Sequence, residues 1–366
     1  MLPARLGMRL RNLGVIAVLA GLLVSAAACS EPPTEYKATV YIFGTLVDFT
    51  ISGAREEDAR EAVGAVEREF QRMHTDWHAW KPGELTRLNQ AIHDGRAMRV
   101  SPFLLPLLVQ ARSLSAASDN LFNPAIGALI AAWGFHNDEL PSGVLPDREE
   151  ISRLAALHPT MADVEISGDM VSSRNRAVQF DFGAFAKGAA LDRAMEILRA
   201  HGIENAIINA GGDLNTLGKA GRGSGGAAKA DGRPWHIGIR APAGRGVIAA
   251  VDLAENENLY TSGNYERYRE SEGIRYSHII DPRDGMPVRH IVSASVIDMN
   301  GAVADAAATA LSVAGPRDWH RIALKMGIKF ALLVDENGTV YLNPEMKARV
   351  EFAKGQPPAI VVSPPL

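Results

Sequence analysis

The sequence predicts one α+β domain that follows an N-terminal export signal. Stretches with strand-like alternation and stretches with helical periodicity succeed one another irregularly, whereas a doubly wound parallel sheet needs regular alternation. The 366 residues are 47% apolar and 22% charged, which supplies a large buried core and excludes a disordered chain. Length alone allows two domains. Residues 38–350 contain neither a repeat of fixed period nor a clean linker, so one domain is favoured, and residues 351–366 form a C-terminal tail.

Residues 1–29 have the composition of a targeting segment. Three arginines precede an apolar run over residues 13–24, which is too short to span a membrane comfortably with these flanks. Small residues then lead to Cys29, in an order that resembles a bacterial lipoprotein signal, where the cysteine becomes the lipidated first residue. Cleavage near Ala28 as an ordinary secretory signal is the alternative, because Ala26 stands where Leu is usual. Both interpretations export the protein to the periplasm or the cell exterior. The first adds a lipid anchor in the membrane, and residues 30–37 form a polar linker.

Helices are predicted where apolar side chains recur at three- and four-residue steps. The first, over residues 56–77, carries Val63, Val66 and Phe70 on one face. Four further helices are expected over residues 102–117, 147–157, 187–201 and 302–314. A shorter apolar element is expected to begin at Asn123 and to end near Phe135.

Strands are predicted where apolar and β-branched residues form short runs between turn residues. Residues 37–52 read as two extended runs joined at Gly44, and residues 178–182 alternate like the end of a strand. Further strands are expected over residues 206–209, 235–239, 248–253, 292–297 and 330–334. Residues 209–213 form a tight strand-to-strand turn, since a dinucleotide fingerprint would need a third glycine and a following helix. Residues 218–233 are expected to form a surface loop.

Composition excludes several classes of function. The formal net charge is −4, so the charge balance does not favour nucleic acid as a partner. The single cysteine excludes a disulfide framework and a cysteine-based metal site. We therefore expect no nucleic-acid partner and no zinc or thiol chemistry.

Residues 181–188 place a carboxylate, a glycine-containing turn and a lysine where a helix begins. Gly183 and Gly188 let the backbone approach a ligand closely. Lys187 lies in the first helical turn, where the helix dipole disfavours a cation, so an anion beside it would explain its presence. A helix start capped by Asp181, with no ligand, is an equally compatible interpretation.

Asp305 and Thr309 lie four positions apart in an alanine-rich helix and therefore on one face. A carboxylate in so apolar a helix is costly to bury without a partner, and a cation would supply that partner. Because two ligands do not complete a site, carbonyl, phosphate or water oxygens would supply the rest, as is usual for Mg²⁺.

His278 is a candidate general base. It precedes two apolar residues and Asp281 on a short strand broken by a turn, and a rigid strand could hold its ring in place. A structural role is the alternative for any single histidine.

Eight short motifs occur in a fixed order over residues 36–343. They are residues 43–45, Trp80 with 84–89, 122–127 with 133–135, 181–188 with 192–193, 211–213, 261–263, 277–285 and 304–310. Each motif alone is weak. As an ordered set, they resemble the FAD:protein FMN transferases of the ApbE family.

This resemblance implies an α+β flavin-transferase fold related to the T-fold, with FAD as substrate and Mg²⁺ as cofactor. Such enzymes cleave FAD, attach FMN to a Thr or Ser hydroxyl of an acceptor protein, and release AMP. The class of acceptor that the family suggests is an exported or membrane electron-transfer subunit.

The resemblance also assigns roles to residues. Mg²⁺ would be bound by Asp305, Thr309 and the Ala184 carbonyl, with the Ala308 carbonyl as a weaker candidate. His278 would help to activate the acceptor hydroxyl, while Lys187 and Mg²⁺ would stabilise charge on the pyrophosphate. FAD would be contacted by Phe43, Trp80, Leu121, Phe122, Asn123, Asp181, Lys187 and Ile280.

Two positions depart from the family pattern: Phe43 replaces a Met, and Asn123 stands where an Asp is common. The Asn123 change could weaken a hydrogen bond to the flavin or the adenine. Three other functions stay open. The chain could be a pyrophosphatase that converts FAD to FMN and AMP, a flavin-binding lipoprotein without turnover, or an anchored structural protein.

Overall fold

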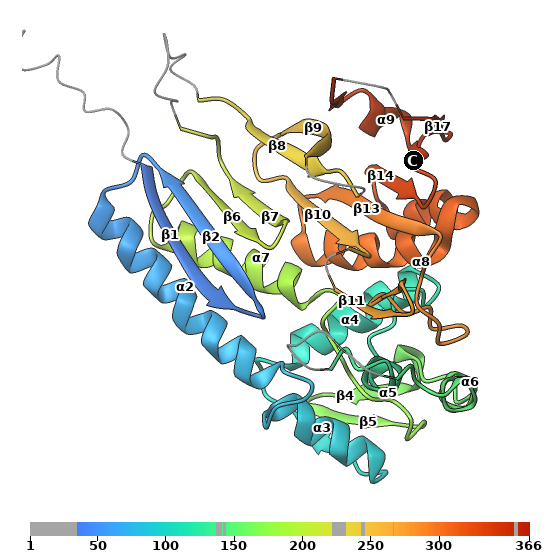
Figure 1. The fold of residues 1–366 in the computed structure, drawn as a ribbon. Helices are drawn as coiled ribbons and strands as arrows, with labels where there is room; N and C mark the ends of the chain where they lie inside the picture. The colour runs from blue at the N-terminus through green and yellow to red at the C-terminus, as the bar shows by residue number, and fades with distance from the viewer. Residues whose placement is uncertain are drawn as a thin grey trace, which may run out of the picture.

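The computed structural model describes residues 35–136, 141, 144–221, 232–242, 246–265, 267–354 and 358–366 (Figure 1). The predicted signal peptide with Cys29, and most of the predicted loop over residues 218–233, lie outside this range. No helix in the described part of the chain is long and apolar enough to cross a lipid bilayer.

A nine-stranded sheet forms the centre of the fold. Its strands pair in antiparallel fashion except for the last pair, β15 and β17, which is parallel. Their order across the sheet is β1 (Glu35–Ile42), β2 (Thr45–Ser52), β6 (Ala206–Ala210), β7 (Asp213–Leu217), β10 (Asn258–Gly263), β13 (Ile291–Asp298), β14 (Phe330–Asp335), β15 (Val340–Leu342) and β17 (Ile360–Val362).

Three long helices pack side by side along this sheet (Figure 1). They are α2 (Glu56–Asp76), α7 (Ala186–Ala200) and α8 (Gly301–Met326). Helix α2 begins with three acidic residues, which favour a helix N-terminus, and buries its apolar stripe. The neighbouring helix α7 contacts both α2 and α8. The main core, which includes Phe49, Phe70 and Leu191, lies between the helices and the sheet.

A second core covers the other face of the sheet at its C-terminal half. There β8 (Trp235–Arg240), β9 (Val247–Leu253) and β16 (Val350–Phe352) form a small sheet, and Trp235, Val251 and Leu259 share one apolar cluster. All five residues of β7 are consequently buried.

The remaining elements gather beyond one end of the central sheet (Figure 1). They are α3 (Glu84–His93), α4 (Leu105–Ala117), α5 (Gly127–Ala132), α6 (Arg148–Ala156), β3 (Met98–Arg99), β4 (Val164–Ser167), β5 (Met170–Ser173), β11 (Tyr268–Ser271) and β12 (Ile274–Ser277). Two short helical segments complete the list: a 3₁₀ turn at Met161–Asp163 and α9 (Pro344–Lys347).

The α+β prediction is confirmed, and so are the five main helices and the predicted strands other than residues 178–182. Two predicted bounds shift: β1 begins at Glu35, inside the predicted linker 30–37, and β17, within the predicted tail 351–366, pairs with β15 in the central sheet. Three further details were wrong. Residues 178–182 are not a strand, because only Gln179 forms a bridge, to Ile126. Helix α4 begins at Leu105, after the turn that Ser101 starts. Helix α8 continues beyond residue 314, through a kink at Gly315 (φ 75°, ψ −179°) and on to Met326.

Candidate functional site

Two buried carboxylates meet where β7, α7 and α8 converge. Asp213 is the first residue of β7 and is 3% exposed, and Asp305 of α8 is 6% exposed. Gly211 and Gly212 have φ angles of 69° and 102°, which glycine adopts readily, and this turn brings Asp213 opposite Ala210 of β6. The tight turn predicted from the sequence is therefore confirmed, and its function is to point a carboxylate into the interior.

Helices α7 and α8 cross at two glycines. A Cβ on Gly188 would lie 2.4 Å from the carbonyl oxygen of Gly301, so only glycine allows this approach. At the same place the Gly188 amide donates to Asp305 Oδ2 at 3.1 Å. First-turn amides have no partner within their own helix, so this bond satisfies an orphan donor and fixes the carboxylate.

Lys187 and Asp213 form a half-buried ion pair. The Lys187 side chain donates to Asp213 Oδ2, and the Thr261 amide donates to Asp213 Oδ1 at 3.3 Å. The sequence suggested that an anion must accompany a lysine in the first turn of α7. The structure supplies one from the chain itself, on the neighbouring strand.

Asp305 has less charge compensation than Asp213. Burial raises the pKa of Asp305 well above its usual value, and the nearby Asp213 raises it further, while Lys187 and the Gly188 amide oppose the shift. A deprotonated Asp305 thus lacks counter-charge in a site that already holds a second carboxylate. Such a group fits a divalent cation as its missing partner.

The other predicted cation ligands are neutral oxygens. Thr309 lies one turn later on α8, and its Oγ1 is 3.2 Å from Ser262 Oγ of β10. Ala184 lies half-buried in the turn before α7. The Ala308 carbonyl already accepts a hydrogen bond from Ser312 Oγ at 2.9 Å.

In the part of the chain that the structure describes, no three His, Cys, Asp or Glu side chains gather into a metal site. A cation at Asp305 would therefore depend on hydroxyl, carbonyl, phosphate and water oxygens, which suits Mg²⁺ and not Zn²⁺.

A buried polar network secures the start of α8. Both Asp192 oxygens accept amide hydrogens of α8, from Gly301 at 2.8 Å and from Ala302 at 3.0 Å. Asn215 donates to Asp192 and accepts from the Tyr260 hydroxyl at 2.6 Å. Burial raises the pKa of Tyr260 well above its usual value, so this residue stays a neutral donor. The network sets the position of α8 against α7, and with it the position of Asp305.

Trp80 and Asp181 are joined although they lie far apart in the sequence. Trp80 Nε1 donates to Asp181 Oδ2 at 2.8 Å, and the Gly183 amide donates to Asp181 Oδ1 at 2.8 Å. Asp181 therefore holds the turn before α7 and the Trp80 indole at the same time. The centre of the His136 ring lies 5.5 Å from that of Trp80.

The other residues predicted to contact FAD differ in their burial and in the groups that they contact. Phe122 is fully buried, with its ring centre 5.3 Å from that of Phe185, directly before α7. The Asn123 side chain binds the Pro159 carbonyl at 2.9 Å and the Ala125 amide at 3.0 Å, so its polar atoms are used within the protein. Ile280 is buried in the cluster with Trp133, and Leu121 is 6% exposed.

Phe43 lies at the β1–β2 turn with a φ of 55° and packs against Phe70 at 5.3 Å between ring centres. Its other ring contact among the described residues is with His74, at 6.0 Å between ring centres. Its predicted contact with a flavin stays a prediction.

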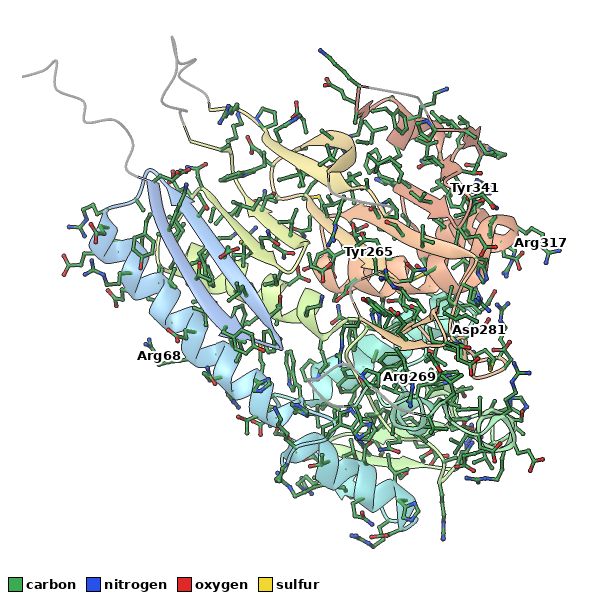
Figure 2. All side chains as sticks on the ribbon, in the orientation of Figure 1. Arg68, Tyr265, Arg269, Asp281, Arg317 and Tyr341 are labelled. Atoms are coloured by element: carbon green, nitrogen blue, oxygen red, sulfur yellow. The ribbon has the colours of Figure 1, made fainter. Side chains whose placement is uncertain are left out.

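His278 lies just after β12, where its side chain is half-buried. Its Nδ1 is 3.0 Å from the Arg267 carbonyl, and because a carbonyl only accepts, Nδ1 carries the proton and Nε2 is the acceptor nitrogen of the neutral ring. Burial lowers the pKa of His278 to about 4, with the charges of Arg267 and Lys187 adding to the effect. Arg269, which lies on β11 and is labelled in Figure 2, donates to the Trp133 carbonyl at 3.2 Å.

A cavity of about 910 Å³ adjoins Trp80. Apolar side chains of α5 and α6, among them Leu129 and Leu154, and polar ones such as Asn89 and Gln179 line it. Its volume is that of a site for a large organic ligand. A smaller cavity of about 210 Å³ is lined by Asp192 and Asn215, but not by Asp305 or Lys187. The lining of the larger cavity includes Trp80 of the predicted site, but neither Asp305 nor Lys187.

Sequence reasoning missed Asp213, Asp192 and Ser262 as site residues. The Gly-Gly-Asp run after a predicted strand was a usable signal for Asp213, since it delivers a carboxylate from a tight turn. Asp192 and Ser262 fall within two of the eight motifs, but their contacts were not predictable, because their partners lie 109 and 47 positions away.

Comparisons with known proteins agree on one family. The model of the ApbE family matches residues 43–332. An FAD:protein FMN transferase of Rhodobacter capsulatus is 46% identical over 346 residues, which is 94% of this chain and 64% of that protein. One of Treponema pallidum is 31% identical over 314 residues, 82% of this chain and 85% of that protein. This chain thus spans about two thirds of the length of the first relative and most of the second.

Solved structures give the same result. The ApbE protein of Thermotoga maritima superposes with a TM-score of 0.74 at 29% identity, covering 88% of this chain and 97% of that one. The flavinyl transferase ApbE of Pseudomonas stutzeri gives 0.71 at 28% identity, covering 84% and 93%. The flavin transferase ApbE of Vibrio cholerae gives 0.75 at 26% identity, covering 87% and 100%.

Proposed function

Because this chain belongs to the ApbE family, we propose that it is an FAD:protein FMN transferase that attaches FMN to a Thr or Ser hydroxyl of an acceptor protein and releases AMP. One structural observation carries the proposal for this chain. The under-compensated Asp305 carboxylate of α8 lies against the start of α7, beside the Lys187–Asp213 pair. A cation bound to Asp305, together with Lys187, would neutralise and orient a pyrophosphate there.

The reaction requires one bond exchange at phosphorus. The acceptor hydroxyl oxygen forms a bond to the phosphorus on the FMN side, and the bond from that phosphorus to the bridging oxygen breaks. AMP leaves with the bridging oxygen, and the hydroxyl proton passes to a base. Such a transfer depends on orientation and charge neutralisation more than on covalent help from the protein.

Asp305 and Thr309, with the Ala184 carbonyl and, as a weaker candidate, the Ala308 carbonyl, would hold Mg²⁺ in this proposal. The ion would supply charge neutralisation at the pyrophosphate. Lys187 adds a fixed positive charge whose position is set by Asp213. Asp181 and Trp80 hold the turn before α7 and would bind FAD together with Phe43, Leu121, Phe122, Asn123 and Ile280.

His278 is our candidate for the base. Its Nε2 is the acceptor nitrogen of the neutral ring, because Nδ1 donates to the Arg267 carbonyl. The lowered pKa keeps the ring in its neutral, proton-accepting form throughout the physiological range, at the cost of basicity, since a general base is most effective when its pKa lies near the working pH.

We expect the His278 ring to stay neutral from pH 8 down to pH 5, because its pKa is lowered to about 4. The cause is burial, which disfavours the charged imidazolium. An NMR titration of the ring Hε1 signal, assigned by comparison with His278→Gln, measures this. A titration near 6.5 for that signal would contradict the proposed environment.

The transferase activity is tested with purified protein, FAD and MgCl₂, with and without an exported electron-transfer protein as acceptor. We expect AMP release to depend on the acceptor, and mass spectrometry to find FMN covalently added to an acceptor Thr or Ser. Rapid FMN and AMP release without any acceptor would instead identify a pyrophosphatase. FAD binding without AMP release, both with and without the acceptor, would identify a flavin-binding protein that has no catalytic activity.

We further propose that the protein is exported and anchored through a lipid on Cys29, which supports an acceptor on the same side of the membrane. Cys29→Ser is expected to move the protein from the membrane fraction to the soluble exported fraction, measured by fractionation and immunoblotting. Equal membrane association of both forms would count against the anchor.

A further inference from the structure

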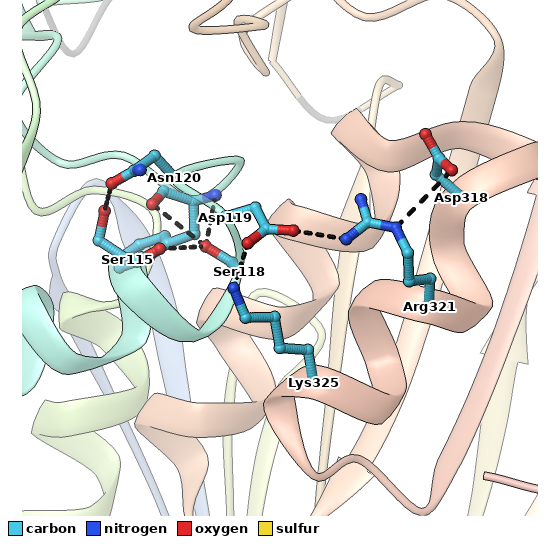
Figure 3. Close-up of polar contacts among 8 residues, drawn as sticks. Ser115, Ser118, Asp119, Asn120, Asp318, Arg321 and Lys325 are labelled. Atoms are coloured by element: carbon cyan, nitrogen blue, oxygen red, sulfur yellow. Dashed lines mark hydrogen bonds and ion pairs between the residues drawn. The ribbon is translucent and has the colours of Figure 1, made fainter.

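A cluster of charges joins the turn after α4 to the last part of α8. Figure 3 shows the Asp119 carboxylate between the side chains of Arg321 and Lys325, which both donate to it. Arg321 also lies 3.9 Å from Asp318, a weaker second contact. Asp119 is 202 positions from Arg321 in the sequence, so this contact ties together two distant parts of the chain.

The backbone of this turn has an uncommon conformation. Asp119 and Asn120 have φ angles of 55° and 60°, the left-handed region that costs free energy for residues with a Cβ. Asp and Asn tolerate this region better than other residues with a Cβ, so the cost is modest, and the surroundings of the turn help to hold it.

Within the turn, those surroundings are hydrogen bonds. The Asn120 amide donates to the Ser115 carbonyl at 2.8 Å, and the Phe122 amide donates to Ser118 Oγ at 3.1 Å (Figure 3). Asp119 is different, because its side chain leaves the turn and reaches α8. Asp119 therefore adds a polar contact with α8 to the apolar packing of α4 and residues 121–122 in the main core.

This turn leads directly into residues 121–123, which our proposed function places at the flavin. Phe122 packs against Phe185, and the Asp181 amide donates to the Pro124 carbonyl at 2.9 Å. A rotation of the turn about its α4 end would move these residues relative to Asp181 and Trp80.

Helix α8 connects the two sides of the site. Its first part carries Asp305 and Thr309, and its second part, after the kink at Gly315, carries Arg321 and Lys325. The kink itself is held, because His290 Nε2 contacts the Ser312 carbonyl at 3.1 Å. One kinked helix thus fixes the proposed cation ligands at one end and the flavin-side turn at the other.

We infer that Asp119, Arg321 and Lys325 form a positioning clamp that holds residues 121–123 in place for FAD binding. The inference rests on the proposed function and names residues that would not touch FAD themselves. The Asp119, Arg321 and Lys325 side chains are 38%, 57% and 47% exposed, so each pair taken singly is weak. Arg321 and Lys325 both donate to the one Asp119 carboxylate, so together they hold the turn more firmly than either pair would alone.

The test is FAD affinity, measured by titration of flavin fluorescence for the full chain and its variants. Asp119→Ala and the double variant Arg321→Ala/Lys325→Ala are each expected to weaken FAD binding by roughly three- to tenfold. The triple variant, which combines Asp119→Ala with Arg321→Ala/Lys325→Ala, should bind FAD no more weakly than Asp119→Ala alone, because all three changes break the same contact. KM for FAD should rise while kcat at saturating FAD stays within about twofold.

Asp318→Ala is the matched control, since it removes the other acidic neighbour of Arg321 and leaves the Asp119 contact intact. Asp119→Asn is the second variant, because Asn also tolerates a positive φ and keeps the turn folded while it removes the charge. It should lose affinity like Asp119→Ala.

Hydrogen exchange at the amides of residues 121–123 gives a readout that needs no flavin. The clamp predicts faster exchange there in Asp119→Asn, with a melting temperature close to that of the wild type. Equal FAD affinity in wild type, Asp119→Ala and Asp119→Asn would overturn the clamp, and so would an equal loss in Asp318→Ala. Wild-type protein that neither binds nor cleaves FAD would overturn the proposed function, which is a separate result.

Discussion

Asp305→Asn is expected to reduce Mg²⁺-dependent AMP release and FMN transfer by about 100-fold or more. Asn keeps the size of the side chain and can accept the Gly188 amide hydrogen, so the helix crossing is preserved. What it removes is the negative charge that would bind the cation. FAD binding should stay measurable, because the predicted flavin contacts at Trp80 and Asp181 are untouched.

The same substitution has an opposite effect on the stability of the metal-free protein. The raised pKa of Asp305 means that its charged form is disfavoured in the folded state. At neutral pH that charge lowers the free energy of unfolding, and the cost disappears as the pH falls and the carboxyl group takes up a proton. Asp305→Asn removes the cost, so without metal it should be as stable as the wild type or more stable by about 1 kcal/mol.

Thermal unfolding with and without MgCl₂ separates these effects. Mg²⁺ should raise the melting temperature of the wild type and leave that of Asp305→Asn unchanged. Asp298→Asn is the matched control, because this acid also has a pKa raised by burial and lies just before α8, where it accepts the Asn300 amide. If Asp305→Asn retains Mg²⁺-dependent AMP release, the metal assignment is wrong.

Gly188→Ala is expected to destabilise the fold by roughly 2–4 kcal/mol and to abolish transfer. The new Cβ would lie 2.4 Å from the Gly301 oxygen, 2.6 Å from its carbonyl carbon and 2.8 Å from the Ala302 Cα. All three are backbone atoms, so no side chain can move aside. Helices α7 and α8 must separate, and the bond from the Gly188 amide to Asp305 is lost.

Gly64→Ala is the control for this prediction. Gly64 lies inside α2, and a Cβ there would meet only the Arg68 guanidinium, at 3.6 Å. Ala has the better helix propensity, so this variant should be more stable by roughly 0.5–1 kcal/mol. Urea unfolding of both variants measures the contrast. A Gly188→Ala protein as stable as Gly64→Ala would show that the two helices do not need their close approach.

Helices and hairpins with a clear apolar pattern were predictable, because residues close together in the sequence determine them. The apolar stripe of α2 and the turn of the β1–β2 hairpin at Gly44 were both placed within a few residues of their observed bounds. The error at residues 178–182 has a physical cause. Alternation there reflects packing of Phe180 and Phe182 into the main core, and Gln179 finds only Ile126 as a strand partner.

Part of the candidate site was also predictable from the sequence. Helical spacing puts Asp305 and Thr309 on one face, and the start of α7 puts Lys187 in the first turn, as observed. The prediction that Lys187 needs an anion was sound in its physics. It did not identify Asp213, because the lysine and its carboxylate lie 26 positions apart on different elements.

By itself, the sequence determined the α+β class, the main helices and strands, the family, and a short list of residues with the right chemistry. Each of these depends on local periodicity or on residue types in a fixed order. The tertiary structure alone decided which groups meet: Gly188 with Asp305 across 117 positions, Trp80 with Asp181 across 101, and Asp119 with Arg321 across 202. These contacts follow from how helices and strands pack in three dimensions, and burial in the same packing raises the pKa of Asp305 and lowers that of His278.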